Sequence, residues 1–179
     1  MGASIWAILV GIDYYQPGDQ RPDIEFPDLK GCVEDINQIE AMLRDLPGPK
    51  LLDIRRLTAS APDNGGDEPK EPPDERPTYA NIVEAFERVI RDAHEDDIIY
   101  IHYSGHGAQV KTIFSDLKDN GLDEVLVPMD ISCGGRYLRD VELAGLLEKM
   151  VAKKLVVTLI LDSCHSGVQT AAATMVIEI

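Results

Sequence analysis

The stretch Leu155–Gly167, LVVTLILDSCHSG, decides the fold that the rest of the sequence fits. Seven apolar or β-branched residues, 155–161, run into the small, polar and ionisable cluster Asp162-Ser163-Cys164-His165-Ser166-Gly167. A continuous apolar run is typical of a strand covered on both faces, as in a parallel sheet between two helix layers. Such sheets bind ligands beyond the carboxyl ends of their strands. The sequence therefore predicts a buried strand that ends in a reactive segment.

A second stretch, 97–107, has the same pattern. The run DIIYIHY (97–103) is followed by Ser104-Gly105-His106-Gly107, where two glycines around a histidine predict a sharp turn. His106 and Cys164 are 164 − 106 = 58 residues apart, which leaves room for one crossover connection and a small insertion. Neighbouring parallel strands can thus bring a thiol and an imidazole to one sheet edge. A cysteine activated by a nearby histidine is the minimal apparatus of a thiol hydrolase.

These two motifs resemble those of a known family. HYSGHG (102–107) and DSCHSG (162–167) are similar to the histidine and cysteine motifs of the metacaspases, the caspase-like cysteine peptidases of fungi, plants and protists. LKGCVED (29–35) and PTYANI (77–82) resemble two further segments of that family, in the same order. The resemblance covers about Ile5 to Gly167.

The resemblance implies both a fold and an activity. Asp162-Ser163 stands where animal caspases carry Gln-Ala before the cysteine, which favours the metacaspase branch. The implied fold is a caspase-like three-layer α/β sandwich with a mostly parallel central sheet. The implied activity is that of a cysteine endopeptidase.

The resemblance also gives roles to two catalytic residues. Cys164 would be the nucleophile and His106 the base, because the attacking thiolate needs an imidazole that takes its proton and later protonates the leaving amine. The backbone N–H groups of Gly107 and Cys164 would form the oxyanion hole. The alternative is a buried structural cysteine and a turn histidine without a chemical role.

Four residues match positions that line the first specificity pocket of the family: Cys32, Asp35, Ser104 and Asp162. Two carboxylates that converge on one pocket would hold a guanidinium bidentately, or an ammonium as a point charge. We therefore expect peptide or protein substrates that are cut after Arg or Lys. For Asp35, the alternative is a solvated acid in the first turn of a helix.

Four acidic residues could form a calcium site of the kind that many metacaspases use for activation: Asp116, Asp119, Asp123 and Asp140. Oxygen ligands suit Ca²⁺, although residues 116–124 lack the register of an EF-hand and Ala171 stands near where the family often supplies an acid. The alternative is a solvated acidic loop. Zinc is not expected, because His102 and His106 would lie about 13 Å apart along a strand, and His165 is read as a loop residue. No organic cofactor is expected.

Composition limits the classes of function. A length of 179 residues predicts one domain, and no apolar run approaches the roughly 20 residues that span a bilayer. The first apolar run, 5–12, lacks the basic leader of a signal peptide, and three cysteines without such a signal favour free thiols in the cytoplasm. The net charge of −15 argues against a nucleic acid partner and favours cationic ligands. We expect no membrane partner.

The remaining segments predict alternating strands and helices. Strands are expected at 4–14, 51–57, 97–103 and 155–161, with a short hairpin arm at 124–128. Helices are expected at 33–45, 78–93 and 140–151. Thr78 is expected to cap the second helix. The apolar stripe expected along the third helix is Val141, Ala144, Leu147 and Val151.

Residues 59–77 differ from the rest of the chain. They hold five of the eleven prolines and eight charged residues, with no aliphatic residue larger than alanine. Such a segment cannot bury enough apolar surface to order itself, which predicts a disordered loop.

The sequence ends 179 − 164 = 15 residues after Cys164, where a metacaspase normally continues into a small-subunit region. We therefore expect residues 1–179 to form a single large-subunit-like domain that lacks the small-subunit strands, with 174–179 beginning one of them. Two hypotheses remain. The chain is a cysteine endopeptidase specific for Arg or Lys, or it is a non-catalytic or partner-dependent regulatory module that binds a small-subunit-like chain through its sheet edge.

Overall fold

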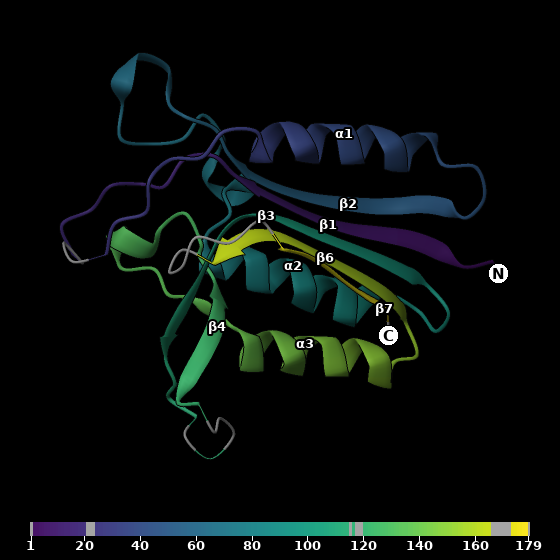
Figure 1. Ribbon diagram of the computed structural model, residues 1–179. Helices are drawn as coiled ribbons and strands as arrows, with labels where there is room; N and C mark the ends of the chain where they lie inside the picture. Colours follow the sequence, from purple (N-terminus) through teal and green to yellow (C-terminus); the bar gives the residue numbers. More distant parts are fainter. Residues whose placement is uncertain (1, 21–23, 115, 117–119, 166–172, 179) are drawn as a thin grey trace.

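A computed structural model describes residues 2–20, 24–114, 116, 120–165 and 173–178. The side chains of residues 64, 164, 165 and 173–178 lie outside this description. The described part is a three-layer α/β sandwich around a mostly parallel central sheet (Figure 1), which confirms the predicted fold class. None of its helices combines the length and the apolar character needed to cross a lipid bilayer.

The central sheet is built from the apolar runs of the sequence. In spatial order its strands are β2 (Lys50–Ala59), β1 (Ser4–Ile12), β3 (Ile98–Lys111), β6 (Val156–His165) and β7 (Ala173–Glu178). The first four strands are parallel, and β7 runs antiparallel to β6. All of β1 beyond Ser4 is buried, as expected for a strand covered on both faces. The strand predicted at 174–179 is present as β7.

Helices cover both faces of this sheet (Figure 1). The helix α1 (Cys32–Asp45) lies on one face, while α2 (Tyr79–Asp92) and α3 (Asp140–Ala152) lie on the other. Beneath α1, Ile36 and Leu43 belong to a small apolar core with Leu9 of β1. A larger core lies on the α2 and α3 face and includes Phe86 and Leu147. The histidine and cysteine motifs thus belong to a sheet that is packed from both sides.

The two helices of the larger core differ in how well the sequence predicts them. The Thr78 side chain caps α2 by accepting the backbone N–H of Asn81 at 3.2 Å, as predicted. The apolar stripe predicted for α3 is wrong, because its buried face consists of Leu143, Leu146, Leu147 and Met150. Ala144 is exposed and Val151 is 41% exposed. Apolar residues occur on more than one side of this helix, so its pattern alone does not select the face that packs.

The two strands that carry the histidine and cysteine motifs run further than the sequence predicts. β3 continues through Gly105 and Gly107 to Lys111 instead of turning, and β6 continues through Asp162 to His165. The extension of β3 has a backbone partner of its own, since residues 107–111 pair antiparallel with β4 (Leu122–Leu126). β4 in turn pairs with β5 (Leu138–Arg139). The predicted hairpin arm is therefore confirmed, and it supplies the hydrogen bonds that keep β3 extended.

Residues 59–77 carry polar contacts and two 3-10 turns, Asp63–Gly65 and Pro73–Glu75. The Glu71 carboxylate accepts the backbone N–H of Ser60 at 2.9 Å and its hydroxyl at 2.7 Å. Lys70 forms an ion pair with Asp63 at 2.7 Å. The disorder predicted for this segment stays a prediction about its behaviour in solution. A third 3-10 turn, Ile131–Cys133, follows β4.

Asp97 joins three segments at the end of the sheet opposite the histidine and cysteine motifs. Its buried carboxylate accepts the backbone N–H groups of Ser4 at 2.8 Å and His94 at 2.9 Å, and the Trp6 indole N–H at 3.0 Å. Burial raises the pKa of the Asp97 carboxyl, but these hydrogen bonds outweigh burial and the pKa is lowered. The ionised carboxylate therefore stabilises the starts of β1 and β3 together.

We predict that Asp97→Ala lowers the free energy of unfolding by roughly 2–3 kcal/mol, because it leaves buried donors without an acceptor. The folded pKa of Asp97 is depressed, so its contribution is complete above about pH 4 and is lost as the pH falls through the folded pKa. Urea denaturation between pH 3 and 7 measures both effects. The control Asp92→Ala, at the exposed end of α2, should change stability by no more than about 0.5 kcal/mol. Equal stability of the two variants would contradict this role of Asp97.

Candidate active site

The pairing of β3 with β6 brings the histidine motif and the cysteine motif together. In their parallel register Ser104 lies opposite Asp162, and His106 lies opposite Cys164. Gly107 lies opposite His165. The side chain of Cys164 lies outside the described part, so the predicted approach of its sulfur to the His106 ring is not described either.

The carbonyl oxygen of Pro27 fixes the tautomer of His106. The His106 side chain is buried, and its Nε2 lies 2.8 Å from that oxygen. A carbonyl oxygen can only accept a hydrogen bond, so Nε2 carries the proton of the neutral ring. The lone pair then lies on Nδ1. His106 is therefore held in the form in which Nδ1 is the basic atom.

Two tyrosine hydroxyls hold the backbone of His106. Its N–H donates to the hydroxyl oxygen of Tyr15 at 2.7 Å, and its carbonyl accepts from the hydroxyl of Tyr103 at 2.8 Å. The ring of Tyr15 also lies 4.8 Å from the imidazole, and that of Phe26 lies 5.3 Å from it, measured between ring centroids. Burial raises the pKa of both tyrosines, so both hydroxyls stay protonated at neutral pH.

Gly105 makes room for these two hydroxyls. A Cβ atom at this position would lie 2.9 Å from the Tyr103 hydroxyl oxygen and 3.0 Å from that of Tyr15. Glycine is therefore required here for close approach, and not for the sharp turn that the sequence predicted. The same close approach lets both tyrosines reach the backbone of the next residue, His106.

The four predicted pocket residues meet between α1 and the ends of β3 and β6. The Ser104 hydroxyl donates to the Asp35 carboxylate at 3.4 Å, and Ser104 is the register partner of Asp162. The backbone N–H of Cys32 donates to the Asp13 carboxylate at 2.9 Å, which anchors the start of α1. Burial raises the pKa of the Cys32 thiol to about 11. A hydrogen bond from Ser104 lowers this pKa, whereas the negative charges of Asp13 and Asp35 raise it further. Cys32 is thus a neutral thiol at pH 7, and two half-buried carboxylates remain as the charged groups of the pocket.

The predicted calcium ligands lie around the β4 hairpin. Asp123 is fully buried and forms an ion pair with Arg139. Asp140 accepts the backbone N–H of Glu124 at 3.4 Å. Asp116 is exposed, and Asp119 lies outside the described residues. Within the described ranges, no three His, Cys, Asp or Glu side chains gather as metal ligands.

The calcium site stays a prediction, because one of its four predicted ligands, Asp119, lies outside the described residues. Ca²⁺ takes roughly six to eight oxygen ligands, and among the described carboxylates that of Asp123 is engaged by the guanidinium of Arg139.

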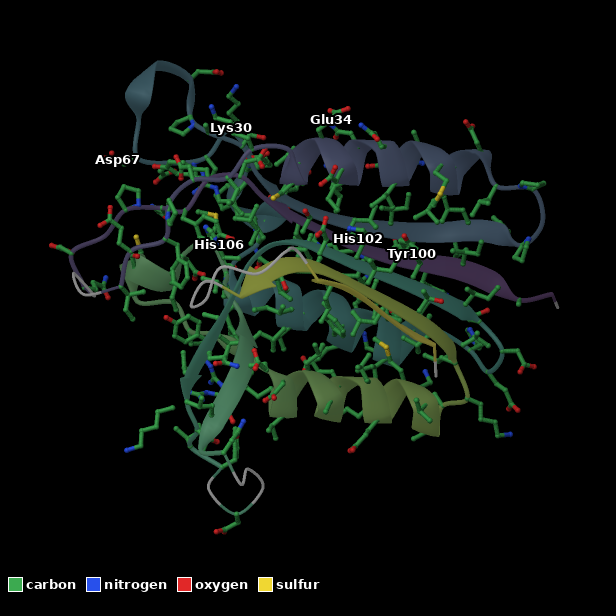
Figure 2. All side chains as sticks on the ribbon, in the orientation of Figure 1. Lys30, Glu34, Asp67, Tyr100, His102 and His106 are labelled. Atoms are coloured by element: carbon green, nitrogen blue, oxygen red, sulfur yellow. The ribbon has the colours of Figure 1, made fainter. Side chains whose placement is uncertain are left out.

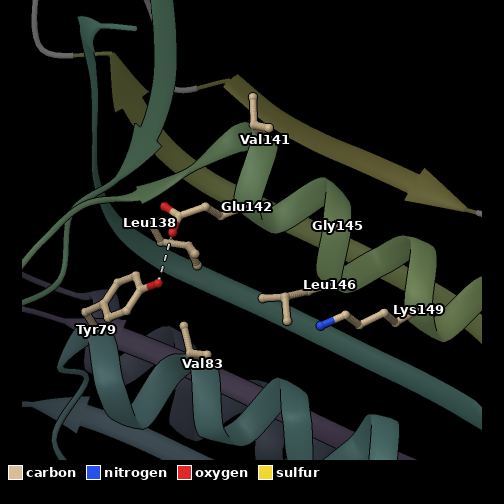
Figure 3. A pocket seen from close by; sticks show the side chains of 8 residues that line it. All are labelled: Tyr79, Val83, Leu138, Val141, Glu142, Gly145, Leu146 and Lys149. Atoms are coloured by element: carbon tan, nitrogen blue, oxygen red, sulfur yellow. Dashed lines mark hydrogen bonds between the residues drawn. The ribbon is translucent and has the colours of Figure 1, made fainter. Parts of the chain in front are cut away.

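The described part of the protein has one cavity near this site and another on the opposite face of the sheet. One, of about 250 Å³, lies beside His106 and includes Tyr15, Phe26 and Pro27 in its lining. The other, of about 270 Å³, lies between α2 and α3 on the far face of the sheet (Figure 3). Its lining residues are Tyr79, Val83, Leu138, Val141, Glu142, Gly145, Leu146 and Lys149. Figure 3 shows the hydrogen bond of 3.0 Å between Tyr79 and Glu142 across it, but the lining has neither a cysteine nor a histidine.

Sequence reasoning missed four residues that position His106: Tyr15, Phe26, Pro27 and Tyr103. Pro27 acts through its backbone carbonyl, and no side-chain pattern reveals such a contribution. Tyr15 gives a clearer signal, because an aromatic residue just past the end of a central strand lies at the same sheet edge as His106. Tyr103 was assigned only to the strand itself.

Three comparisons relate the chain to known proteins. A family model described as "Metacaspase, peptidase C14 domain" matches residues 6–172. Metacaspase-1A of Aspergillus niger is 32% identical over 161 residues, which make up 90% of this chain and 35% of that protein. Metacaspase-1 of Ajellomyces capsulatus is 33% identical over 161 residues, 90% of this chain and 40% of that protein. The chain thus spans well under half the length of these relatives.

A solved structure resembles the fold. The crystal structure of protein GSU0716 from Geobacter sulfurreducens matches with a TM-score of 0.65 and 24% identity. The match covers 92% of this chain and 52% of that one. At this level of identity, the likeness supports the architecture alone.

We predict that Tyr15→Phe lowers the free energy of unfolding by about 1–3 kcal/mol, because the buried N–H of His106 loses its acceptor. The matched control is Tyr14→Phe, since the Tyr14 hydroxyl makes only a long contact of 3.5 Å with the Gly66 carbonyl. Chemical denaturation compares the two variants, and ¹⁵N chemical shifts report the ring of His106. Loss of stability should be confined to Tyr15→Phe. If both variants are as stable as the parent, the Tyr15 hydroxyl does not support His106.

Proposed function

The chain belongs to the metacaspase family of C14 peptidases, and from that premise we propose that it forms the catalytic part of a cysteine endopeptidase that cleaves after Arg or Lys. The observation that carries this proposal is the state of His106, whose Nε2 faces the Pro27 carbonyl and whose register partner is Cys164. A base with its lone pair on a known atom, opposite a cysteine, is what thiol-based acyl transfer needs.

The proposed reaction follows from these atoms. The Cys164 thiol gives its proton to Nδ1 of His106 while the sulfur adds to the carbonyl carbon of the scissile bond. The carbonyl oxygen becomes an oxyanion that faces the N–H groups of Gly107 and Cys164. The C–N bond then breaks as the imidazolium returns its proton to the leaving amine. Water, deprotonated by His106, hydrolyses the thioester and restores the thiol.

The hydrogen bond to Pro27 supports this cycle. When Nδ1 takes the thiol proton, the ring becomes a cation with both nitrogens as donors, and Nε2 still donates to the same carbonyl. His106 can therefore change its charge without changing its orientation. The aromatic rings of Tyr15 and Phe26 restrict the remaining rotation of the imidazole.

The proposed specificity rests on charge. Asp35 and Asp162 approach Ser104 from α1 and from β6, with the neutral Cys32 thiol beside them. No cationic side chain is among the hydrogen-bond partners of Ser104 or Asp35 in the described part of the chain. Two carboxylates that converge without a cationic partner among the described residues favour a guanidinium or ammonium group from a substrate.

Activation by calcium stays a prediction from the family resemblance, since the described ligands do not assemble a site. The partner-dependent alternative also stays open, because the chain spans 35–40% of the length of two metacaspase relatives. The two hypotheses differ in whether the chain hydrolyses peptides without a partner chain.

We predict that a peptide chloromethylketone ending in arginine alkylates Cys164, and that Cys164→Ala abolishes both labelling and hydrolysis of arginyl peptides. The matched control is Cys133→Ala, which removes a cysteine whose sulfur donates to the loop carbonyls of Gln16 and Pro17. Mass spectrometry identifies the labelled residue.

Labelling of Cys133 in place of Cys164 would contradict the assignment of the nucleophile. Labelling that occurs only after a small-subunit-like chain is added would favour the partner-dependent alternative.

We predict that Asp162→Asn raises the KM for arginyl substrates roughly 10- to 100-fold with a smaller effect on kcat, because a charge-assisted hydrogen bond is worth about 1.5–3 kcal/mol. Steady-state kinetics with arginyl and lysyl peptides tests this. Asp92→Asn, at the end of α2 on the far face of the sheet, is the control for a lost negative charge. An unchanged KM in Asp162→Asn would exclude Asp162 from the pocket.

A further inference from the structure

His102 is a buried histidine on β3 that has no role in the proposed mechanism. Its side chain lies on β3, two residues before Ser104 and four before His106, and it is only 8% exposed. Neither of its ring nitrogens has a hydrogen-bond partner within the described part of the chain. Figure 2 shows Tyr100, His102 and His106 in succession along this strand.

An unsatisfied imidazole is costly at such a position. A buried polar group without a partner destabilises a fold by about 1–3 kcal/mol, and an apolar side chain of similar shape would remove that cost. The neighbours of His102 in the sheet are Leu9 on β1 and Ile160 on β6, so an apolar residue would suit the site. The ring stacks on Tyr100, with centroids 6.4 Å apart and planes at 22°. Nothing in this packing requires a histidine.

The position of His102 relative to the predicted pocket suggests a role in binding substrate. Ser104 and His102 are two residues apart on one strand and so share a face of the sheet, separated by roughly 7 Å. The groups that act electrostatically on the ring are the carboxylates of Asp162 and Asp35. His102 therefore lies one step deeper than Ser104 along the face on which both carboxylates converge.

We propose that His102 forms the floor of the pocket for the basic substrate residue, and that its unprotonated ring nitrogen accepts an N–H from the guanidinium or ammonium group. This inference rests on the proposed function and adds a specificity-determining residue to it. Asp35 and Asp162 supply charge from the walls, while His102 supplies a directed acceptor at the depth that only a long basic side chain reaches. The orphaned nitrogen would then be satisfied when substrate is bound.

The protonation state of His102 agrees with this role. Burial lowers the pKa of the imidazole, and Asp162 and Asp35 only partly offset that effect. The ring is therefore neutral at pH 7 and has one acceptor nitrogen. The titratable groups that act on it are Asp35 on α1 and Asp162 on β6, and Tyr100 on its own strand stacks on its ring. As the pH falls below about 6.5, protonation would place a cation where the substrate's cation has to bind.

The test uses the Cys164→Ala protein, so that binding is measured without turnover. We expect N-acetyl-arginine amide to move the ring resonances of His102 in NMR spectra, whereas the uncharged N-acetyl-citrulline amide leaves them in place. His102→Phe identifies the signals. It should weaken binding of the arginine compound about tenfold and remove the loss of binding that accompanies protonation of His102 below about pH 6.5. The control Tyr100→Phe, on the same face of β3, should bind as the parent does.

The outcomes separate this inference from the proposed function. If the arginine compound moves the amide signals of Asp35 and Ser104 but not the His102 ring, the basic pocket stands and its floor is another residue. If it moves no signal near α1, both the floor and the pocket are wrong. His102→Phe should be at least as stable as the parent, because an apolar ring replaces an unsatisfied one. A large loss of stability without a change in affinity would assign His102 a purely structural role.

Discussion

The parallel register between β3 and β6 is the constraint on which the site depends. It sets His106 opposite Cys164 and Ser104 opposite Asp162 in one continuous ladder. A shift of one residue along either strand would turn the side chains of that strand to the opposite face of the sheet. The register is held by burial on both sides, since α1 covers one face of these strands and α2 and α3 cover the other. The chemistry is thus positioned by packing that extends far from it.

Around this ladder, buried polar groups do most of the positioning. His106 is fixed at its ring by Pro27 and at its backbone by two tyrosine hydroxyls, and Gly105 leaves the space for both. The two hydrogen bonds to its backbone are buried, so the loss of either tyrosine hydroxyl is expensive. His102 is the exception, because it is buried on the same strand without a partner in the described structure. A basic side chain of a bound substrate would supply the hydrogen-bond donor that the His102 ring lacks in the described structure.

The sequence predicts the elements better than their ends. The four parallel strands, the three helices and the Thr78 cap follow from apolar periodicity and capping chemistry, which are local. The continuation of β3 and β6 beyond their apolar runs could not be predicted in that way, because it depends on pairing of residues 107–111 with β4. The buried face of α3 and the carbonyl of Pro27 are likewise set by tertiary contacts. The candidate residues of the dyad and the pocket could be named from three short motifs, 29–35, 102–107 and 162–167, whereas the tyrosines that hold His106 required the structure.

The central claim is that Cys164 and His106 form one chemical unit, and the pH dependence of Cys164 alkylation by iodoacetamide tests it most directly. Mass spectrometry can follow Cys164 alone, while burial raises the pKa of Cys32 to about 11 and also raises that of Cys133. If the two residues share a proton, Cys164 should react rapidly well below the pH of about 8.5 at which free cysteine ionises. His106→Ala should return its reactivity to that ordinary range. Alkylation of Cys164 that follows the same pH profile with and without His106 would contradict the account.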